Sequence, residues 1–252
     1  MLGKELLQAG QMADVMGPVN EYHGFRLQRH ISDEATVITY KAADGSMKRM
    51  AVLDAKDRAV CQFGAYNRDS SLANFGGGNI NNSNLIVYKA FPLSIEQCNR
   101  QLPEMINNEA IYEEWCEGLK ADLTARENCD VWMQWCYSTS YAPGWCRSKI
   151  LDGTLCDVPN LYEAMTIWAC SDMLDEMDKS AGAFPRLLLG YRSTASSTIG
   201  RKQMSANGDI SQALWSSTEV SSDAVRRVFH DGSCGLHYKN YNGTAVPILE
   251  LD

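Results

Sequence analysis

The chain has 252 residues, of which 45% are hydrophobic and 21% charged, and its 31 acidic and 23 basic residues give a formal net charge of -8. This composition excludes a disordered, collagenous or coiled-coil protein. The negative charge argues against a nucleic-acid partner, because phosphate contacts need clustered cations, and the sequence has no run of about 18 apolar residues that would insert into a membrane.

The first residues and the cysteines bear on where the protein folds. Residues 1–17 lack the basic start, apolar middle and small-residue cleavage site of a secretory signal, so we expect a native N-terminus. The nine cysteines lie singly from Cys61 to Cys234 without a C-x-x-C pair, which is typical of neither a disulfide framework nor a zinc ribbon. We expect most of them to be buried free thiols of a protein that folds in a reducing cytoplasm. Spacing alone leaves disulfides between distant cysteines open.

A short helix is expected to open the chain. Apolar residues recur at helical spacing over 2–16, and Gly17 and Pro18 then stop the pattern. We assign residues 1–20 to this helix and expect it to attach the chain to partner subunits.

The next segment is predicted to be a small β-rich module over 21–90. It holds short runs rich in β-branched and aromatic residues, and Asp44-Gly45 is a hairpin turn signal. The Gly/Asn-rich stretch 73–84 predicts a loop or a boundary, because it cannot form a regular element at low cost.

Helices and then short strands are predicted between residue 91 and the C-terminus. Ser94 is a candidate N-cap of a helix that Pro103 interrupts. Short strands are expected from residue 213 onward. Between them, Asn160 caps a second helix whose apolar face carries Leu161, Met165, Trp168, Ala169 and Met173, with Trp168 in a structural role.

Four strings in this part of the chain carry a resemblance to a known family: VPNLYEAM at 158–165, LWSSTE at 214–219, AVRRVFHDGS at 224–233 and AVPILEL at 245–251. They are similar to the C-type-lectin-like domains of bacterial adhesins, phage fibre proteins and retroelement-diversified variable proteins. The resemblance implies an α+β fold over 91–252, with a twisted antiparallel sheet and flanking helices. The sequence departs from the family pattern in having Val158 in place of leucine before Pro159 and Val246 in place of arginine before Pro247.

The chemistry of these residues gives a second line of prediction. Trp215 suits a half-buried strand, and Glu219 on the same strand is expected to be a structural hydrogen-bond acceptor. In the next strand the alternation of side chains places Arg226 and His230 on one face. Arg227 then falls on the apolar face, which leaves open a bulge, a buried stem or a different register.

The tract HYKNYNG at 237–243 has the composition of a recognition surface, because Tyr and Asn supply amphipathic contact area and adaptable hydrogen bonds. In the family that the sequence resembles, this tract and the preceding hairpin line the exposed ligand-binding face. Among these residues we expect Tyr238 to be the one most prone to burial. The alternative to a binding surface is that the tract is a polar connection that binds nothing. The resemblance implies ligand-binding roles for Arg226, His230, His237, Tyr238, Asn240, Tyr241 and Asn242.

Metal and catalytic sites are expected to be absent. His230, Cys234 and His237 form an H-x3-C-x2-H pattern, but strand parity points Cys234 away from His237. The calcium-dependent sugar signatures of animal lectins are missing, since the tripeptide at 158–160 lacks a carboxylate. The sequence shows no Ser-His-Asp order, phosphate loop or HExxH. We therefore expect no cofactor.

An oxidase is the enzymatic alternative, because the formylglycine-generating enzymes are related in fold to the C-type-lectin-like domains. Resemblance to them implies a redox-active cysteine pair, for which Cys129 with Cys136 and Cys146 with Cys156 are the candidates. Reactive thiols need electropositive, partly exposed surroundings, whereas these four lie among tryptophans in the sequence. We expect a structural role for them.

The sequence favours a non-enzymatic virion structural protein, a head-fibre, tail-fibre or capsid-decoration subunit of a phage that is assembled in the host cytoplasm. We expect a homo-oligomer, dimer or trimer, that contacts other virion proteins through its N-terminal region and binds a host-surface protein or glycan. Neither nucleic-acid binding nor membrane insertion is expected. A secreted bacterial adhesin at the cell surface is the second hypothesis, and a formylglycine-generating-type oxidase is the third.

Overall fold

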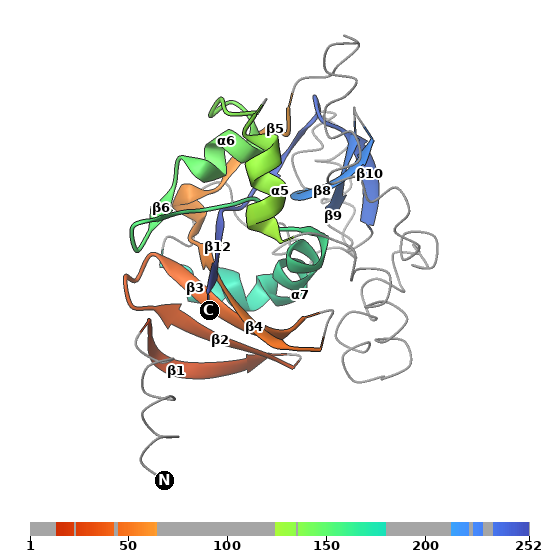
Figure 1. Ribbon diagram of the computed structural model, residues 1–252. Coiled ribbons are helices and arrows are strands. Elements are labelled where there is room, and N and C mark those ends of the chain that lie inside the picture. The colour runs from red at the N-terminus through yellow and green to blue at the C-terminus, as the bar shows by residue number, and fades with distance from the viewer. Residues whose placement is uncertain are drawn as a thin grey trace, which may run out of the picture.

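Figure 1 shows the computed structural model of the chain. It describes residues 14–22, 24–42, 45–64, 124–134, 136–179, 213–221, 224–228 and 234–251. Within these ranges the protein is a mixed α+β structure with two five-stranded sheets, a two-stranded hairpin and three α-helices. Several predictions of the sequence fall outside them: the helix up to residue 13, Asp44, the loop at 73–84, the helix after Ser94, and His230.

Sheet A is built from the first four strands of the chain and its last one. All neighbours are antiparallel, and the last strand joins through the pair Ile248 and Val52. The C-terminal strand therefore completes the sheet that the N-terminal residues begin. The strand order is β1 (Val15–Tyr22), β2 (Phe25–His30), β3 (Ala35–Lys41), β4 (Met47–Leu53) and β12 (Ile248–Leu251).

Strand β1 corrects the expected N-terminal helix, because residues 15–20 are extended rather than helical. Gly17 has a φ of +79°, and the register with β2 shifts between Met16 and Asn20, as in a bulge. Pro18 is tolerated here because β1 is the edge strand of sheet A, where a missing backbone N–H need not break the sheet.

Sheet B also joins both ends of the chain. Strand β11 is antiparallel to β5 and parallel to β8, which it meets through Thr244 and Leu214. The expected β-rich module thus shares each sheet with strands of the expected C-terminal domain, and residue 90 does not separate two sheets. The strand order is β10 (Cys234–Tyr238), β9 (Ala224–Val228), β8 (Leu214–Ser221), β11 (Asn242–Ala245) and β5 (Ala59–Gln62).

Helix α7 (Leu161–Met177) contacts sheet A through β3 and sheet B through β8 and β9 (Figure 1). The predicted N-cap is confirmed: the Asn160 side chain accepts from the Glu163 backbone N–H, and the Glu163 carboxylate accepts from the Asn160 N–H. The helix is buried on nearly all sides over its first three turns, rather than on the one predicted face, because both sheets cover it. No helix among the described residues is long and apolar enough to span a membrane.

Two shorter helices, α5 (Ala125–Trp132) and α6 (Ala142–Arg147), pack over sheet B. Their tryptophans help form a second core cluster around Trp215, which is fully buried rather than half-buried as predicted. The indole N–H of Trp215 donates to the carbonyl of Cys61 at 2.9 Å. Gly243 faces this ring, and a Cβ at that position would lie 2.7 Å from it. The neighbouring strand therefore needs glycine at this point.

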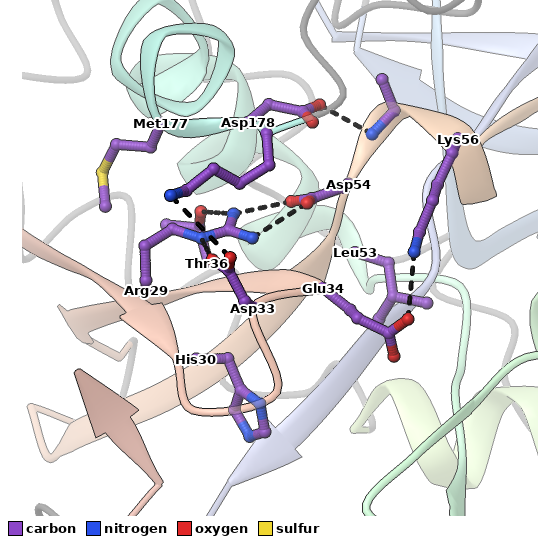
Figure 2. A network of polar contacts seen from close by, with 12 residues as sticks. Arg29, His30, Asp33, Glu34, Thr36, Leu53, Asp54, Lys56, Met177 and Asp178 are labelled. Carbon is purple, nitrogen blue, oxygen red and sulfur yellow. Dashed lines mark hydrogen bonds and ion pairs between the residues drawn. The ribbon is translucent and has the colours of Figure 1, made fainter. Parts of the chain in front are cut away.

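A buried polar network ties sheet A to the end of α7 (Figure 2). The Arg29 guanidinium donates to both carboxylate oxygens of Asp54, at 2.8 and 2.9 Å, and also to Asp33. Asp178, just after α7, accepts from the backbone N–H of Ala55 at 2.7 Å. The loop after β4 is thus held from one side by sheet A and from the other by α7.

We expect Asp54→Ala to lower the free energy of unfolding by about 3 kcal/mol, because it leaves the buried Arg29 with the half-exposed Asp33 as its charged partner and a neutral contact with Thr36. The control is Glu34→Ala, which removes an exposed ion pair with Lys56 and should cost less than about 1 kcal/mol. Urea unfolding followed by circular dichroism measures both variants. Equal losses in the two would contradict the role assigned to Asp54.

Candidate functional site

Three rings of the predicted binding tract lie together where β10 turns into β11. The turn is closed by the Tyr241 N–H, which donates to the Tyr238 carbonyl at 3.2 Å. The His237 and Tyr241 rings meet edge to face with centroids 4.4 Å apart, and the Tyr238 and Tyr241 rings lie 6.1 Å apart at 26°. We call His237, Tyr238 and Tyr241 the aromatic cluster.

The described site residues differ in exposure, and His237 and Asn240 are half-buried. Tyr238 and Tyr241 are each 43% exposed, and Asn242 is exposed as well. The expectation that Tyr238 is the member most prone to burial is therefore wrong. Arg226 is the buried one, with 1% of its surface exposed, so the structure does not place it on an exposed binding face.

Arg226 is buried because β9 is covered on both faces, so that alternation along the strand does not distinguish an inner from an outer side. The neighbouring Arg227, whose placement on the apolar side the sequence left open, pairs in register with Trp215. Its guanidinium lies over that indole ring, 5.3 Å from the centroid, and donates to the Asn242 carbonyl at 3.2 Å. A cation over a ring and a backbone acceptor thus account for Arg227 inside the structure.

The turn beneath the aromatic cluster is anchored by Lys239, whose side chain is buried. Its ammonium lies 3.2 Å from a carboxylate oxygen of Glu219 and 4.4 Å from the centroid of the Trp132 ring. The Lys239 carbonyl accepts from the Gly64 N–H at 3.0 Å. The predicted role of Glu219 as a structural acceptor is confirmed by this contact. Because Lys239 points inward, its two tyrosine neighbours in the turn are held near the surface.

The aromatic cluster is close to uncharged at neutral pH. Burial, together with the positive charge of Arg227, lowers the pKa of His237 to about 4, so its imidazole is neutral. The Nδ1 atom of His237 and the Oδ1 atom of Asn240 are buried without a hydrogen-bond partner. The site therefore combines neutral rings with polar atoms whose hydrogen bonds are not yet made.

The candidate thiols do not have the properties of a redox pair. All four candidate cysteines are free and buried: Cys129, Cys136, Cys146 and Cys156. Cys170 is also free and buried, and Cys61 is free and half-buried. Burial raises the pKa of Cys136 and of Cys156 to about 12, and that of Cys129 and Cys146 well above its usual range. Such thiols remain protonated at neutral pH and are poor nucleophiles.

One constellation was missed by sequence reasoning. The hydroxyl of Ser32 lies 2.8 Å from Nδ1 of His30, and Nε2 of that ring lies 3.0 Å from a carboxylate oxygen of Asp152. A hydroxyl, an imidazole and a carboxylate in this order are the parts of a nucleophilic catalyst. The sequence gives no signal for the third member, because Asp152 is distant in the chain.

The hydrogen bonds around Ser32 assign this constellation a structural role. The Ser32 N–H donates to His30, the Asp33 N–H to the His30 carbonyl, and the Glu34 N–H to the Ser32 hydroxyl. These N–H groups are thus not available to stabilise an oxyanion. The contact instead fastens the turn of the hairpin β6 (Ile150–Leu151) and β7 (Thr154–Leu155) to the end of β2.

Among the described residues, no group of three or more His, Cys, Asp or Glu side chains is placed to hold a metal ion. The H-x3-C-x2-H pattern lies partly outside them, since His230 and the Cys234 side chain are not described. Comparison of the chain with protein-family models, with curated proteins and with solved structures finds no match in any of the three.

We expect the stability contribution of Glu219 to depend on pH. Burial raises its pKa to about 7 in the folded protein, against an ordinary value of 4.5, so folding favours the protonated form. This contribution is fully present below about pH 4.5 and is lost as the pH rises through 7. Relative to Glu219→Gln, the wild type should gain about 1–3 kcal/mol between pH 7 and 4.5. Urea unfolding at several pH values measures the difference. Glu21→Gln, at an exposed carboxylate, is the control and should show no such trend.

We expect alkylation of the native protein to leave the six described thiols almost unmodified. At pH 7.5 their reaction with iodoacetamide should be at least about 100-fold slower than in urea, because a thiol that is both buried and protonated reacts slowly. Peptide mapping by mass spectrometry assigns the rate to each cysteine. A fast native reaction at Cys129, Cys136, Cys146 or Cys156 would revive the oxidase hypothesis.

Proposed function

We propose that this chain is a non-enzymatic attachment protein of a phage virion, a subunit of a head fibre, tail fibre or capsid decoration. Its C-terminal part, for which we propose a C-type-lectin-like fold, presents the aromatic cluster to a receptor on the host surface. The observation that carries the proposal is that two tyrosines are exposed on a turn whose own lysine is locked in the core. This combination is what a recognition surface requires.

The anchored turn favours binding in two ways. Aromatic side chains supply large contact area and have few rotatable bonds, so they lose little conformational freedom when a ligand covers them. The contacts of Lys239 with Glu219 and Gly64 already fix the backbone of the turn. Binding therefore does not lose the conformational entropy that ordering a flexible loop would cost. The alternative is that the tract only links β10 to β11 and binds nothing. That alternative gives no reason for two exposed tyrosine rings to be held together.

The thiols support assembly in a cytoplasm over export. All six cysteines that the structure describes are free, and free buried thiols are typical of proteins from reducing compartments. The adhesin hypothesis predicts disulfides, which these six do not form. The oxidase hypothesis predicts a thiol of lowered pKa, whereas burial raises the pKa of each of the six.

The N-terminal edge of sheet A supports a role in subunit contacts. Strand β1 pairs with β2 on one side, and its other edge pairs with none of the described strands. Met16 and Val19 are exposed on this strand. Because an unpaired edge with apolar side chains is a surface on which another chain can add, we place the contacts with other virion proteins and within a homo-oligomer at this end.

The experiment is binding of the fluorescently labelled full chain to a panel of intact bacterial strains. We expect binding to a subset of strains, and expect Tyr241→Ala and His237→Ala to weaken it at least tenfold, as is usual for an aromatic residue at the centre of an interface. Their melting temperatures should stay within about 2 °C of the wild type, since neither ring belongs to a core cluster.

The control is Ile150→Ala, which alters an exposed apolar side chain of β6 and should leave binding unchanged, because β6 and β10 lie on opposite sides of the view in Figure 1. Absence of binding to every strain, or equal binding by all variants, would contradict the proposal. As a separate check, portal, capsid or tail genes should lie beside the gene for this chain.

A further inference from the structure

The two tyrosines of the aromatic cluster form a small, nearly parallel pair. Their rings are inclined by only 26°, with centroids 6.1 Å apart, and the imidazole of His237 closes one side, 4.4 Å from Tyr241. The face of an aromatic ring is electron-rich and attracts weakly positive C–H groups. A pyranose ring offers such groups on one face and hydroxyls around its rim, so it matches rings that are bordered by hydrogen-bonding side chains.

Within residues 237–242 no charged side chain is exposed, which favours an uncharged ligand. Lys239, the one ionisable group besides the cluster residues within 237–242, is buried and paired with Glu219. Arg227 is buried under the tract. A sialylated sugar or an acidic peptide needs exposed cations, and a calcium-bridged sugar needs several carboxylate oxygens. The tract offers neither an exposed cation nor a carboxylate.

Hydrogen-bonding capacity is left over beside the rings. The His237 Nδ1 and the Asn240 Oδ1 have no partner, and the amide of Asn242 is on the exposed side of the turn. A buried polar atom without a partner is unfavourable, because its desolvation is not compensated by a hydrogen bond. A small rearrangement that brings these atoms to a ligand hydroxyl would recover that free energy. Hydroxyl groups both donate and accept, and can therefore serve all three side chains.

The exposed area of the two tyrosines suits a sugar ring. A tyrosine side chain presents about 200 Å² when fully accessible, so two that are 43% exposed offer roughly 200 Å² together. A stable protein interface needs about 800 Å² on each side. One or two sugar rings need no more than the cluster provides, and several copies on one particle would turn weak single contacts into firm attachment.

We infer that the aromatic cluster binds a neutral glycan of the host surface, without a calcium ion, by stacking a sugar ring on Tyr238 and Tyr241 and hydrogen-bonding it to Asn240, Asn242 and His237. This inference rests on the proposed function, because it names the ligand class of the same surface. We assign the central contact to Tyr241, since its ring makes the closest contact within the aromatic cluster, 4.4 Å from His237, against 6.1 and 6.5 Å for the other two pairs.

The test uses the strains that the full chain binds, each in four preparations: untreated, oxidised with periodate to cleave vicinal diols, digested with protease, and incubated with EDTA. We expect periodate to reduce binding at least tenfold, and protease and EDTA to leave it within twofold. Binding that survives periodate, or is lost after protease or EDTA, overturns the glycan inference while the attachment function stands. Absence of binding to all untreated strains removes both.

Variants at Tyr241 give a second readout on an array of neutral oligosaccharides. The wild type should bind a defined subset, Tyr241→Phe should stay within about threefold because the ring is kept, and Tyr241→Ala should lose at least tenfold. Circular dichroism confirms that each variant is folded. Equal binding by Tyr241→Ala and the wild type, or binding confined to sialylated or sulfated sugars, contradicts the inference.

Discussion

The buried pair of Lys239 and Glu219 is the interaction on which the candidate site depends. A buried ion pair adds little net stability, because desolvation of both charges offsets their attraction, but loss of either partner strands the other in a low-dielectric interior. Its effect is therefore one of specificity: it fixes which residue of the turn points inward. The indole of Trp132, lying over the ammonium, favours the same arrangement. With the lysine inside, the turn presents tyrosines outside.

Charged side chains are distributed unevenly over the fold: ion pairs hold structural elements together, whereas the aromatic cluster carries no charge. One group of ion pairs lies where α7 meets sheet A, around Arg29, Arg58, Asp54 and Asp178. A second group links α5 and α6 through Arg147 and Asp157. The aromatic cluster, in contrast, is neutral. The ion pairs around Arg29 and Arg58 are thus distinct from the uncharged rings that are proposed to meet a ligand, and the Lys239–Glu219 pair links the turn of those rings to the core.

Features that depend on residues close together in the chain could be predicted from the sequence. The N-cap at Asn160 and the helix that follows it depend on neighbours in the chain, and the structure confirms them. The acceptor role of Glu219 is confirmed as well, although its partner Lys239 lies 20 residues away in the sequence. The errors arose where burial depends on distant segments. Alternation along β9 placed Arg226 outside because it assumed one solvated face, and helical spacing near the N-terminus concealed an edge strand. Ser32, His30 and Asp152 meet only through the fold. The family resemblance stays a prediction, since it depends on four short strings.

Both sheets are completed by the last strands of the chain, β11 and β12. During synthesis the edges of β4 and β5 emerge from the ribosome long before β11 and β12, the strands that cover them. Contacts this remote in sequence form slowly, and open edges promote aggregation in the interval. A chain that lacks residues 242–251 would therefore leave β4 and β5 uncovered, one edge in each of the two five-stranded sheets.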